Sequence, residues 1–504
     1  MLLRPGADDL RLIGYYLGKV LLGLGLVMGL AALVALGTQE WNTLTAFVIG
    51  AALCGIVGGA AEATLATRQQ LSWAHGMVTV ALAWLVGAVF AAVPFHLSGH
   101  YEDWLSAVFE GMSALTTTGL SVISDLDHTT WSMDFYRHLL HFAGGQGIIL
   151  VVLSLFAAGG GQIGTLYVAE ARDERILPNF IRTARFIFRV AATFLVIGTA
   201  ALFVALLVAG FTPLRSAYHA ILLFFAAFDT GGFAPMQASV AYYHSFAVEA
   251  VVMVLLLAGS LSFGLHFALW NGDWRQVTRH IETRTLAISS SVLFAVICFG
   301  LVASKTYDGF EPLMRKGFFT LLSATSSAGS QVNHGSTYLT DWGVLAPAAI
   351  VAAMAIGGMA SSTAGGIKAM RVGIAAKTLL HDIRRLLNPE SAVVVTTYHA
   401  GKRHILRDKT ARAATSVLLL FVVTYLLGAM AGLAYGQYDI TQTLFESVSA
   451  TSNIGLTIGV TDPGMPRGLM AVYLVQMWLG RLEFVAVFAM LGYLLSLARG
   501  RASA

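Results

Sequence analysis

The sequence predicts an all-α polytopic membrane protein built from four helix–pore-loop–helix repeats around a central pore, with two extra membrane helices at the N-terminus. Composition is the first observation: 57% of the 504 residues are hydrophobic and only 12% are charged, about half the charged share of a soluble domain. Apolar runs of ~20 residues recur, which is the length that crosses a bilayer and is too long for transmembrane β-strands.

The third observation is a short segment that occurs four times in altered form. Each copy reads small-Ala-x-x-x-x-Gly and lies between a short apolar run and a long one. Irregular backbone at membrane depth must line a water-filled cavity or be buried in protein, and four such loops meeting at one centre satisfy this rule together. We therefore infer that the four segments form an ion filter. They are Ser113–Leu120, Ala226–Phe233, Ser323–Ser330 and Ser449–Leu456.

The chain divides into an N-terminal extension and four repeats. Two helices, about 11–37 and 44–64, form the extension, and in each repeat a spanning helix precedes ~12–15 residues that are too short to span. Ten spans and four re-entrant segments are expected. The divisions are 1–70, 71–170 (repeat A), 171–280 (B), 281–400 (C) and 401–504 (D). The paired spans are 73–95 with 132–158, 186–210 with 241–270, 283–304 with 341–380, and 410–434 with 468–497.

Orientation follows from the distribution of Lys and Arg. With the N-terminus in the cytoplasm and ten spans, 24 of the 31 basic residues lie on the cytoplasmic side, as the positive-inside rule requires. Both termini are then cytoplasmic, the four filter segments face outward, and Arg481 is left inside the last helix. The outer side holds Arg137, Arg215, Lys305, Arg315, Lys316 and Arg467.

The outer face near the first filter carries acidic residues and no Lys or Arg between positions 96 and 131. Such a surface concentrates cations at the mouth of a pore. The acidic residues are Glu102, Asp103, Glu110, Asp125 and Asp127.

The repeated segment has the chemistry that a cation filter requires. A half-helix that ends at the cavity directs the negative end of its dipole toward the centre, and the following backbone carbonyls can replace the water shell of an ion. Glycine permits backbone angles that other residues avoid and leaves no side chain in the pore. The expected K⁺-binding filter residues are Thr117, Thr118, Gly119, Thr230, Gly231, Gly232, Ala328, Gly329, Asn453, Ile454 and Gly455.

On these motifs the chain resembles the TrkH/KtrB/HKT superfamily of potassium transporters, over about residues 70–504, and the two extra N-terminal helices favour its TrkH branch. Four further stretches are similar to family signatures: His141–Ile149, Phe263–His266, Ile356–Lys368 and Leu479–Glu483. The resemblance implies channel-like potassium uptake across the bacterial inner membrane. It also implies a homodimer and a separate nucleotide-binding cytoplasmic ring, TrkA, that controls the gate. The basic segments 172–189 and 368–412 are candidate docking surfaces for that ring, although the positive-inside bias explains the same charges.

Two filters depart from the family pattern. Asp229 stands where a small neutral residue is expected, and its carboxylate either modifies cation selectivity or points away and caps backbone N–H groups. The third filter, Ser327–Ser330, lacks the usual Gly-Phe pair. All four glycines are present, however, and the serine that goes with sodium transport in the plant branch is absent, which favours potassium.

The second half of repeat C is interrupted by ten residues that are mostly Gly, Ala and Ser, where a helix is unfavourable. The resemblance implies that this stretch is an intramembrane loop that blocks the pore; the alternative is a close helix crossing. Lys368 at its end either contacts the loop or partner, or anchors the helix at the interface. The loop residues are Gly357, Gly358, Ser361, Ser362, Thr363, Ala364, Gly365 and Gly366.

Arg481 is costly inside a membrane helix unless it is paired. Glu483, two residues on, points elsewhere on a helix. We expect Arg481 near the pore below the filter, neutralised by a carboxylate or by half-helix carbonyls; a purely structural ion pair is the alternative. Glu110 and Glu446 share one position, nine residues before Gly119 and Gly455.

Other functions are less consistent with the pattern. The stretch 159–164 fits G-x-G-x-x-G but follows a membrane helix, without a βαβ unit, so neither a nucleotide site nor an enzyme is expected. An alternating-access symporter, coupling K⁺ or Na⁺ to H⁺, is the main alternative, but it would show broken helices in corresponding halves. Cys54 and Cys298 lie in apolar runs and suggest neither a metal site nor a disulfide.

Overall fold

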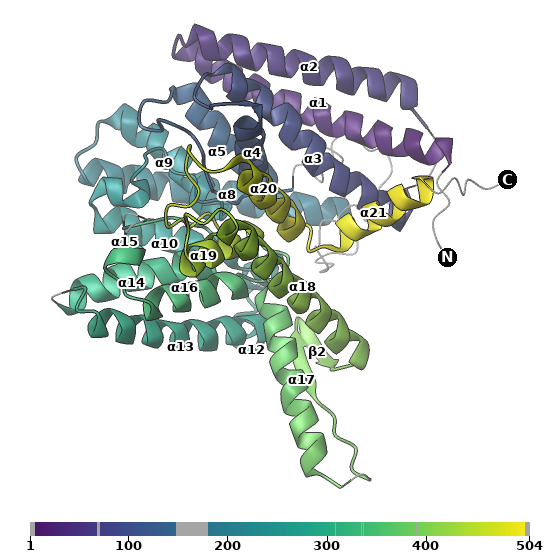
Figure 1. Ribbon diagram of the computed structural model, residues 1–504, viewed down its shortest axis with the longest axis vertical. Helices are drawn as coiled ribbons and strands as arrows, with labels where there is room; N and C mark the ends of the chain where they lie inside the picture. Colours follow the sequence, from purple (N-terminus) through teal and green to yellow (C-terminus); the bar gives the residue numbers. More distant parts are fainter. Residues whose placement is uncertain are drawn as a thin grey trace.

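The computed structural model describes residues 6–67, 71–147, 180–307, 309–333, 335, 337–389 and 391–498. The first two helices, α1 (Ala7–Gly37) and α2 (Trp41–Leu65), pack side by side along one flank of the bundle (Figure 1). Their crossing is close because a Cβ on Gly18 would lie 2.9 Å from the carbonyl oxygen of Gly58. Lys19 Nζ is 3.5 Å from Glu62 Oε1 across the same interface.

Four repeats follow, and each places a short pore helix between an outer helix and an inner segment. The outer helices are α3 (Trp73–Leu97), α8 (Phe180–Val208), α13 (Ile281–Ala303) and α18 (Asp408–Leu433). The pore helices are α4 (Trp104–Leu115), α9 (Pro213–Phe228), α14 (Phe310–Thr325) and α19 (Ile440–Thr451). The inner helices are α5 (Trp131–Gly145), α10 (Phe246–Ser260) with α11 (Phe263–Trp270), α16 (Leu345–Ile356) with α17 (Ala369–Leu387), and α20 (Arg467–Arg481) with α21 (Val485–Ala498). Three short helices connect them: η1 (Ser239–Tyr243), α12 (Arg275–Arg279) and α15 (Thr337–Thr340).

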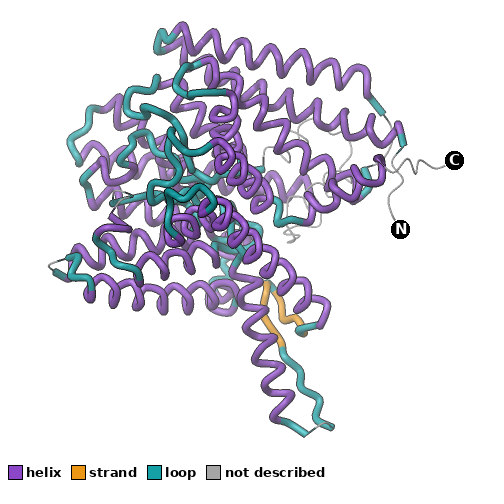
Figure 2. The backbone as a smooth tube through the Cα atoms, viewed as in Figure 1, coloured by secondary structure: helices purple, strands orange, loops and turns teal. Residues whose placement is uncertain are grey.

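The repeats close into a ring. Each pore helix packs against the outer and inner helices of its own repeat, and each inner helix also packs on the next pore helix: α5 on α9, α10 on α14, α16 on α19, and α20 on α4. The last contact joins repeat D to repeat A. Helices occupy the periphery and the non-helical backbone gathers in the middle (Figure 2).

The inner segments differ from the continuous spans that the sequence predicted. Within the described residues, six helices are long and apolar enough to cross a membrane, and two further pairs qualify jointly but are bent. The bend is 101° between α10 and α11 and 108° between α20 and α21. The second bend has a local cause, because Glu483 and Phe484 have positive φ angles of 49° and 69°.

The inner segments of repeats A and C are not continuous helices either, and for repeat C the sequence predicted the interruption. In repeat A, α5 ends at Gly145, and the end of the predicted span 132–158 lies outside the described residues. In repeat C, α16 and α17 are separated by a non-helical stretch at 357–368. The alternative of a close helix crossing at this stretch is therefore wrong.

A hairpin beside α17 was not predicted. Its strands β1 (Thr397–Ala400) and β2 (Lys402–Ile405) pair antiparallel, with Tyr398 opposite His404. Gly401 supplies the positive φ of 66° at the turn, a conformation that suits glycine. Together with α17, the hairpin projects away from the helical bundle (Figure 1).

Candidate functional site

The four pore helices end in the same way. In repeat A the N–H of Thr117 donates to Ala114 O (3.3 Å) and that of Thr118 donates to Ser113 O (2.9 Å), which is the Schellman pattern of a helix C-terminus. The same two backbone bonds occur in the other three repeats. The left-handed residues two positions before the filter glycines are Thr117 (φ 53°), Thr230 (51°), Ser327 (61°) and Asn453 (52°).

The filter segments meet in a closed ring at their glycines. A Cβ on Gly119 would collide with the carbonyl oxygen of Gly231, and one on Gly232 would collide with that of Ala328. The ring continues in the same sense through Gly329 with Ile454 and Gly455 with Thr118. Each glycine therefore lies against the carbonyl that precedes the glycine of a neighbouring repeat, and no larger residue fits. All eleven predicted filter residues lie in these four segments.

Glycines on three inner helices allow the scaffold to approach the filter. A Cβ on Gly144, Gly259 or Gly480 would collide with the last carbonyl of the adjacent pore helix, at Leu115, Phe228 or Thr451 respectively. Gly144 and Gly480 belong to two of the stretches singled out from the sequence. Their role is close helix packing around the filter.

Asp229 caps its pore helix and contacts the neighbouring repeat. It follows the last residue of α9, and its Oδ1 accepts a hydrogen bond of 2.6 Å from Gln146 Nε2. A Cβ on Gly145 would lie 2.7 Å from the Asp229 Cβ. The carboxylate is therefore held against the end of α5.

A buried ion cluster lies behind the first filter, and it contains Glu110, which the sequence predicted on the acidic surface near that filter. Arg137 and Glu110 are 1% and 0% exposed, and Arg137 Nε donates to Glu110 Oε1 at 2.9 Å. Asp134 lies 3.2 Å from the same guanidinium. Glu110 thus does not contribute to the outer surface, and Arg137 is not an exposed outer charge, because the two neutralise each other inside the protein.

The outer acidic residues have structural partners. Asp103 caps α4 through the N–H of Ser106, and this hydrogen bond lowers the pKa of the Asp103 carboxyl, with further lowering from Arg467. Arg467 Nη2 lies 2.9 Å from Asp103 Oδ2. Asp127 Oδ1 accepts from the N–H of Gln237 (2.8 Å) and so joins the loops that follow the filters of repeats A and B.

The stretch 357–368 forms a loop whose two ends are joined. The N–H groups of Ile367 and Lys368 donate to Ala355 O (3.1 Å) and Ile356 O (2.9 Å), and that of Ala369 donates to Gly358 O (2.9 Å). A Cβ on Gly357 would collide with the carbonyl oxygen of Gly365. Only glycine permits so close a crossing of two backbone strands.

The loop contacts the second, third and fourth filter segments directly. Thr363 Oγ1 donates to Phe228 O (3.1 Å) at the end of pore helix α9. Thr230 Oγ1 in turn donates to Thr363 Oγ1 at 3.2 Å. Ser327 Oγ donates to Gly365 O at 3.3 Å, and a Cβ on Gly365 would collide with the carbonyl oxygen of Ser452. Ser361, Ser362 and Ala364 lie in the same loop.

Arg481 completes the contact between the loop and repeat A. Its Nη1 donates to Thr117 Oγ1 and to Thr363 O, both at 3.1 Å, and its Nη2 donates to Gly144 O at 2.8 Å. The guanidinium therefore bonds to carbonyl and hydroxyl oxygens at the base of the first filter.

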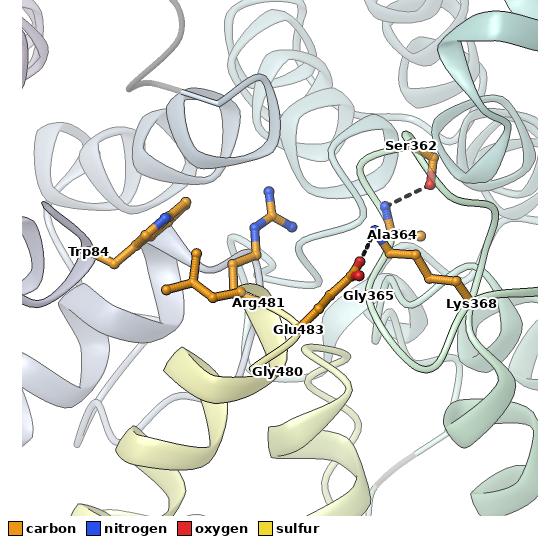
Figure 3. Close-up of a pocket in the computed structure, with 9 residues that line it drawn as sticks. Trp84, Ser362, Ala364, Gly365, Lys368, Gly480, Arg481 and Glu483 are labelled. Carbon is orange, nitrogen blue, oxygen red and sulfur yellow. Dashed lines mark hydrogen bonds and ion pairs between the residues drawn. The ribbon is translucent and has the colours of Figure 1, made fainter. Parts of the chain in front are cut away.

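Glu483 holds the C-terminal end of the loop at 357–368. Its carboxylate lies 2.7 Å from Lys368 Nζ and also pairs with Arg371, and it is 4% exposed. Arg481 and Glu483 extend in different directions from the break between α20 and α21 (Figure 3). Between them lies a cavity of about 20 Å³ lined also by Trp84 and Gly365, with room for about one water molecule.

Sequence reasoning missed this double ion pair. It recognised that Glu483 is a poor partner for Arg481, but it could not see that the carboxylate reaches Lys368, more than one hundred residues away. A signal did exist, because Lys368 and Glu483 end two of the stretches singled out from the sequence, and a buried carboxylate and ammonium are expected to pair.

Comparison with known proteins gives a consistent assignment. The TrkH family model, described as a cation transport protein, matches residues 43–303 and 277–491. An uncharacterized cation transporter of Methanocaldococcus jannaschii is 29% identical over 488 residues, covering 96% of this chain and 95% of the relative. The Trk system potassium uptake protein TrkH of Halomonas elongata is 29% identical over 496 residues, covering 95% and 98%.

The fold has a close counterpart among solved structures. The crystal structure of the potassium transporter TrkH from Vibrio parahaemolyticus superposes with a TM-score of 0.81 at 25% sequence identity, covering 96% of this chain and 98% of that one. The similarity thus spans the N-terminal pair of helices and all four repeats.

Proposed function

This chain belongs to the TrkH family of cation transport proteins, multi-pass membrane proteins rather than enzymes, and from that premise we propose that it conducts potassium ions through the ring of four filter segments. The observation that carries the proposal is the cyclic contact of each filter glycine with the carbonyl before the glycine of a neighbouring repeat. Four carbonyl-bearing segments around one axis are what a dehydrated monovalent cation requires. A fourfold ring favours channel-like permeation over the twofold arrangement of an alternating-access symporter.

Two features of the ring favour a cation. Four pore helices end at it, and the negative ends of their dipoles are directed toward the ring. The filter backbone is also held rigidly, since each segment begins with a Schellman cap and ends at a glycine that has no room for a side chain. In this proposal the carbonyls of Thr118, Gly231, Ala328 and Ile454 bind K⁺.

The loop at 357–368 acts as the gate in this proposal. It lies against three filter segments through Thr363 and Gly365, and in this proposal that contact blocks the path of a hydrated ion. Arg481 adds an electrostatic barrier, since a cation that leaves the filter meets its positive charge. Permeation then requires the loop and Arg481 to separate from the filter.

The proposed setting is the bacterial inner membrane, with both termini in the cytoplasm. In this orientation 24 of the 31 basic residues lie on the cytoplasmic side and six on the outer side, and the positive-inside rule supports this orientation. A cytoplasmic nucleotide-binding ring of the TrkA kind would then control the gate, and a homodimer is the proposed assembly. The name of the Halomonas relative, a Trk system protein, supports such a partner.

The decisive experiment measures cation flux in liposomes that contain the purified chain. Potassium, rubidium and sodium fluxes are compared for the unmodified chain and for Gly119→Ser, with Gly59→Ser as the control because a Cβ at Gly59 meets nothing within 4 Å. We expect potassium and rubidium to exceed sodium, and Gly119→Ser to lose this preference while the control keeps it.

Each other outcome has a defined meaning. Equal sodium and potassium flux would contradict the selectivity. Absence of flux with the partner ring present would contradict conduction itself. Uphill rubidium accumulation driven by a pH gradient would favour the proton-coupled symporter instead.

A further inference from the structure

A basic cavity lies far from the filter, at the beginning of α13. It has a volume of about 680 Å³ and is formed by α13, α17 and the β-hairpin, with the end of α12 at its edge. Four cationic side chains line it: Arg279, Arg284, Lys377 and Arg403. No part of the ion pathway described above contributes to it.

The cations are held in position but are not neutralised. Lys377 Nζ donates to Thr397 O (2.9 Å) and Arg403 Nε to Thr397 Oγ1 (3.1 Å), while Arg284 Nε donates to Thr278 O (2.7 Å). In the part of the chain that the structure describes, none of the four forms a salt bridge with a carboxylate. Several N–H groups therefore remain for an anion, and such donors bind phosphate strongly.

The hairpin is fixed in place by packing, so the wall that it contributes to the cavity has a defined position. Tyr398 packs against a small cluster formed by Ile281, Ile374 and Ala414. His399 Nε2 lies 2.8 Å from Gln276 Oε1, which ties the hairpin to α12. Two independent contacts thus hold the hairpin over the beginning of α13.

The wall of the cavity that α13 forms continues onto a membrane-facing surface of that helix. Ile288 lines the cavity and is 67% exposed, and Val292, one turn along α13, is 58% exposed on the same side. This helix is one of the six apolar spans. A ligand that fills the cavity therefore needs an anionic head and an apolar tail that follows α13 into the bilayer.

We propose that this cavity binds the phosphate headgroup of an anionic glycerophospholipid, whose acyl chain lies along Ile288 and Val292. The inference rests on the proposed orientation, which places these cations at the cytoplasmic leaflet, where anionic headgroups attract basic groups. It is independent of which cation is transported. Because the cavity joins α13 to α17, the helix that leaves the gating loop, the lipid would connect these two elements.

The test is native mass spectrometry of the purified full chain, titrated with phosphatidylglycerol and, separately, with phosphatidylcholine. The pocket variant combines Arg284→Gln with Arg403→Gln. The control combines Arg384→Gln with Arg385→Gln, two exposed cations in the last turn of α17 that do not line the cavity. Both variants remove two positive charges, so they differ only in where the charge is lost.

We expect phosphatidylglycerol to bind in preference to phosphatidylcholine, with roughly 30-fold weaker binding in the pocket variant and unchanged binding in the control. Equal weakening in both variants would overturn the proposal, because it would show a diffuse charge effect. So would complete competition by inorganic phosphate, which would identify a soluble anion as the ligand. If the pocket variant does not fold, Arg279→Gln alone is measured, with an expected loss of about fivefold; no loss would contradict the site.

Discussion

Glu110 and Glu446 occupy equivalent positions in repeats A and D and fasten the chain that leaves each filter. Glu110 accepts from the N–H of Val122 (3.2 Å) and Glu446 from the N–H of Ile458 (3.0 Å). Each donor is three residues after the filter glycine. The two carboxylates therefore hold the chain that follows their filters, and repeats B and C have Leu223 and Thr320 at the same place.

Glu446→Ala should destabilise the protein and loosen the fourth filter. Glu446 also accepts from the N–H of Val460 (3.2 Å), so its removal leaves two backbone donors without their acceptor at a site that is 0% exposed. The expected cost is about 3 kcal/mol. Thermal unfolding in detergent measures it, and the rubidium-to-sodium flux ratio should fall. Glu102→Ala, an exposed carboxylate, is the control; equal behaviour of the two variants would contradict this role.

Gly329→Ala should strongly reduce rubidium flux and, like Gly119→Ser, lower the preference for rubidium over sodium. The added methyl group would collide with the carbonyl oxygen of Ile454, and Gly329 also has a φ of 69°, which alanine adopts at a cost. Rubidium flux in liposomes is the measurement. Gly59→Ala on α2 adds the same methyl group where nothing lies within 4 Å, and it should conduct normally. Undiminished flux in Gly329→Ala would show that the ring is not the ion path.

Thr363→Val should ease the separation of the loop from the filter. Valine keeps the shape of threonine but cannot donate to Phe228 O and Gly259 O, which Thr363 Oγ1 contacts at 3.1 and 2.9 Å. Loss of about 1.5 kcal/mol of hydrogen bonding corresponds to roughly a tenfold shift toward the open state. Basal rubidium flux without a partner protein should rise accordingly. Thr424→Val, which affects only a bond within α18, should leave the flux unchanged.

Glu483→Gln should also raise the basal flux, through a different contact. Glutamine is close in size to glutamate but removes the charge that pairs with Lys368 and Arg371. The two cations would then lack a counter-charge in a buried place, which is costly, and the beginning of α17 should become mobile. Hydrogen exchange of residues 357–371 together with rubidium flux tests this. Exchange and flux that match those of the unmodified chain would show that the pair does not hold the gate.

Asp229→Asn should leave the rubidium-to-sodium flux ratio unchanged. The Asp229 carboxylate accepts from Gln146 Nε2 at 2.6 Å, and the asparagine oxygen can accept the same bond. A clear change in the ratio upon loss of the charge would show that the carboxylate acts on permeating ions. The same vesicle assay applies, with Asp229→Ala measured alongside to separate the hydrogen bond from the charge.

The filter was predictable because its signals are local. Each pore helix ends at a Schellman cap, and the left-handed residue of that cap lies two positions before the filter glycine. In repeat A the cap and the glycine therefore both fall between Ser113 and Gly119, in one short segment that recurs. The glycine has a long-range reason, the carbonyl of the next repeat, but four aligned copies reveal it without coordinates. The non-helical stretch at 357–368 was predictable for a similar reason, since consecutive small residues disfavour a helix.

The bends of the inner segments were not predictable in the same way. Residues 241–270 and 468–497 are mostly apolar and long enough to cross a bilayer, and length with hydropathy predicts a single span despite Arg481 and Glu483 in the second range. The bend after Arg481 depends on two non-glycine residues, Glu483 and Phe484, with positive φ, and tertiary contacts of Glu483 with Lys368 and Arg371 stabilise it. The burial of Arg137 was not predictable for a related reason, because its partner Glu110 lies 27 positions earlier.

The closure of the gating loop makes it a single mechanical body with α17. Three backbone hydrogen bonds join its ends at Ile367, Lys368 and Ala369, so the loop cannot unravel from one side while these bonds remain. The adjoining helix Ala369–Leu387 has 19 residues and extends about 28 Å. A force applied to its far end, where the chain projects from the bundle, would therefore rotate the helix and the loop together. Because the helix is longer than the loop, the loop would move less than the far end of the helix and would experience a larger force.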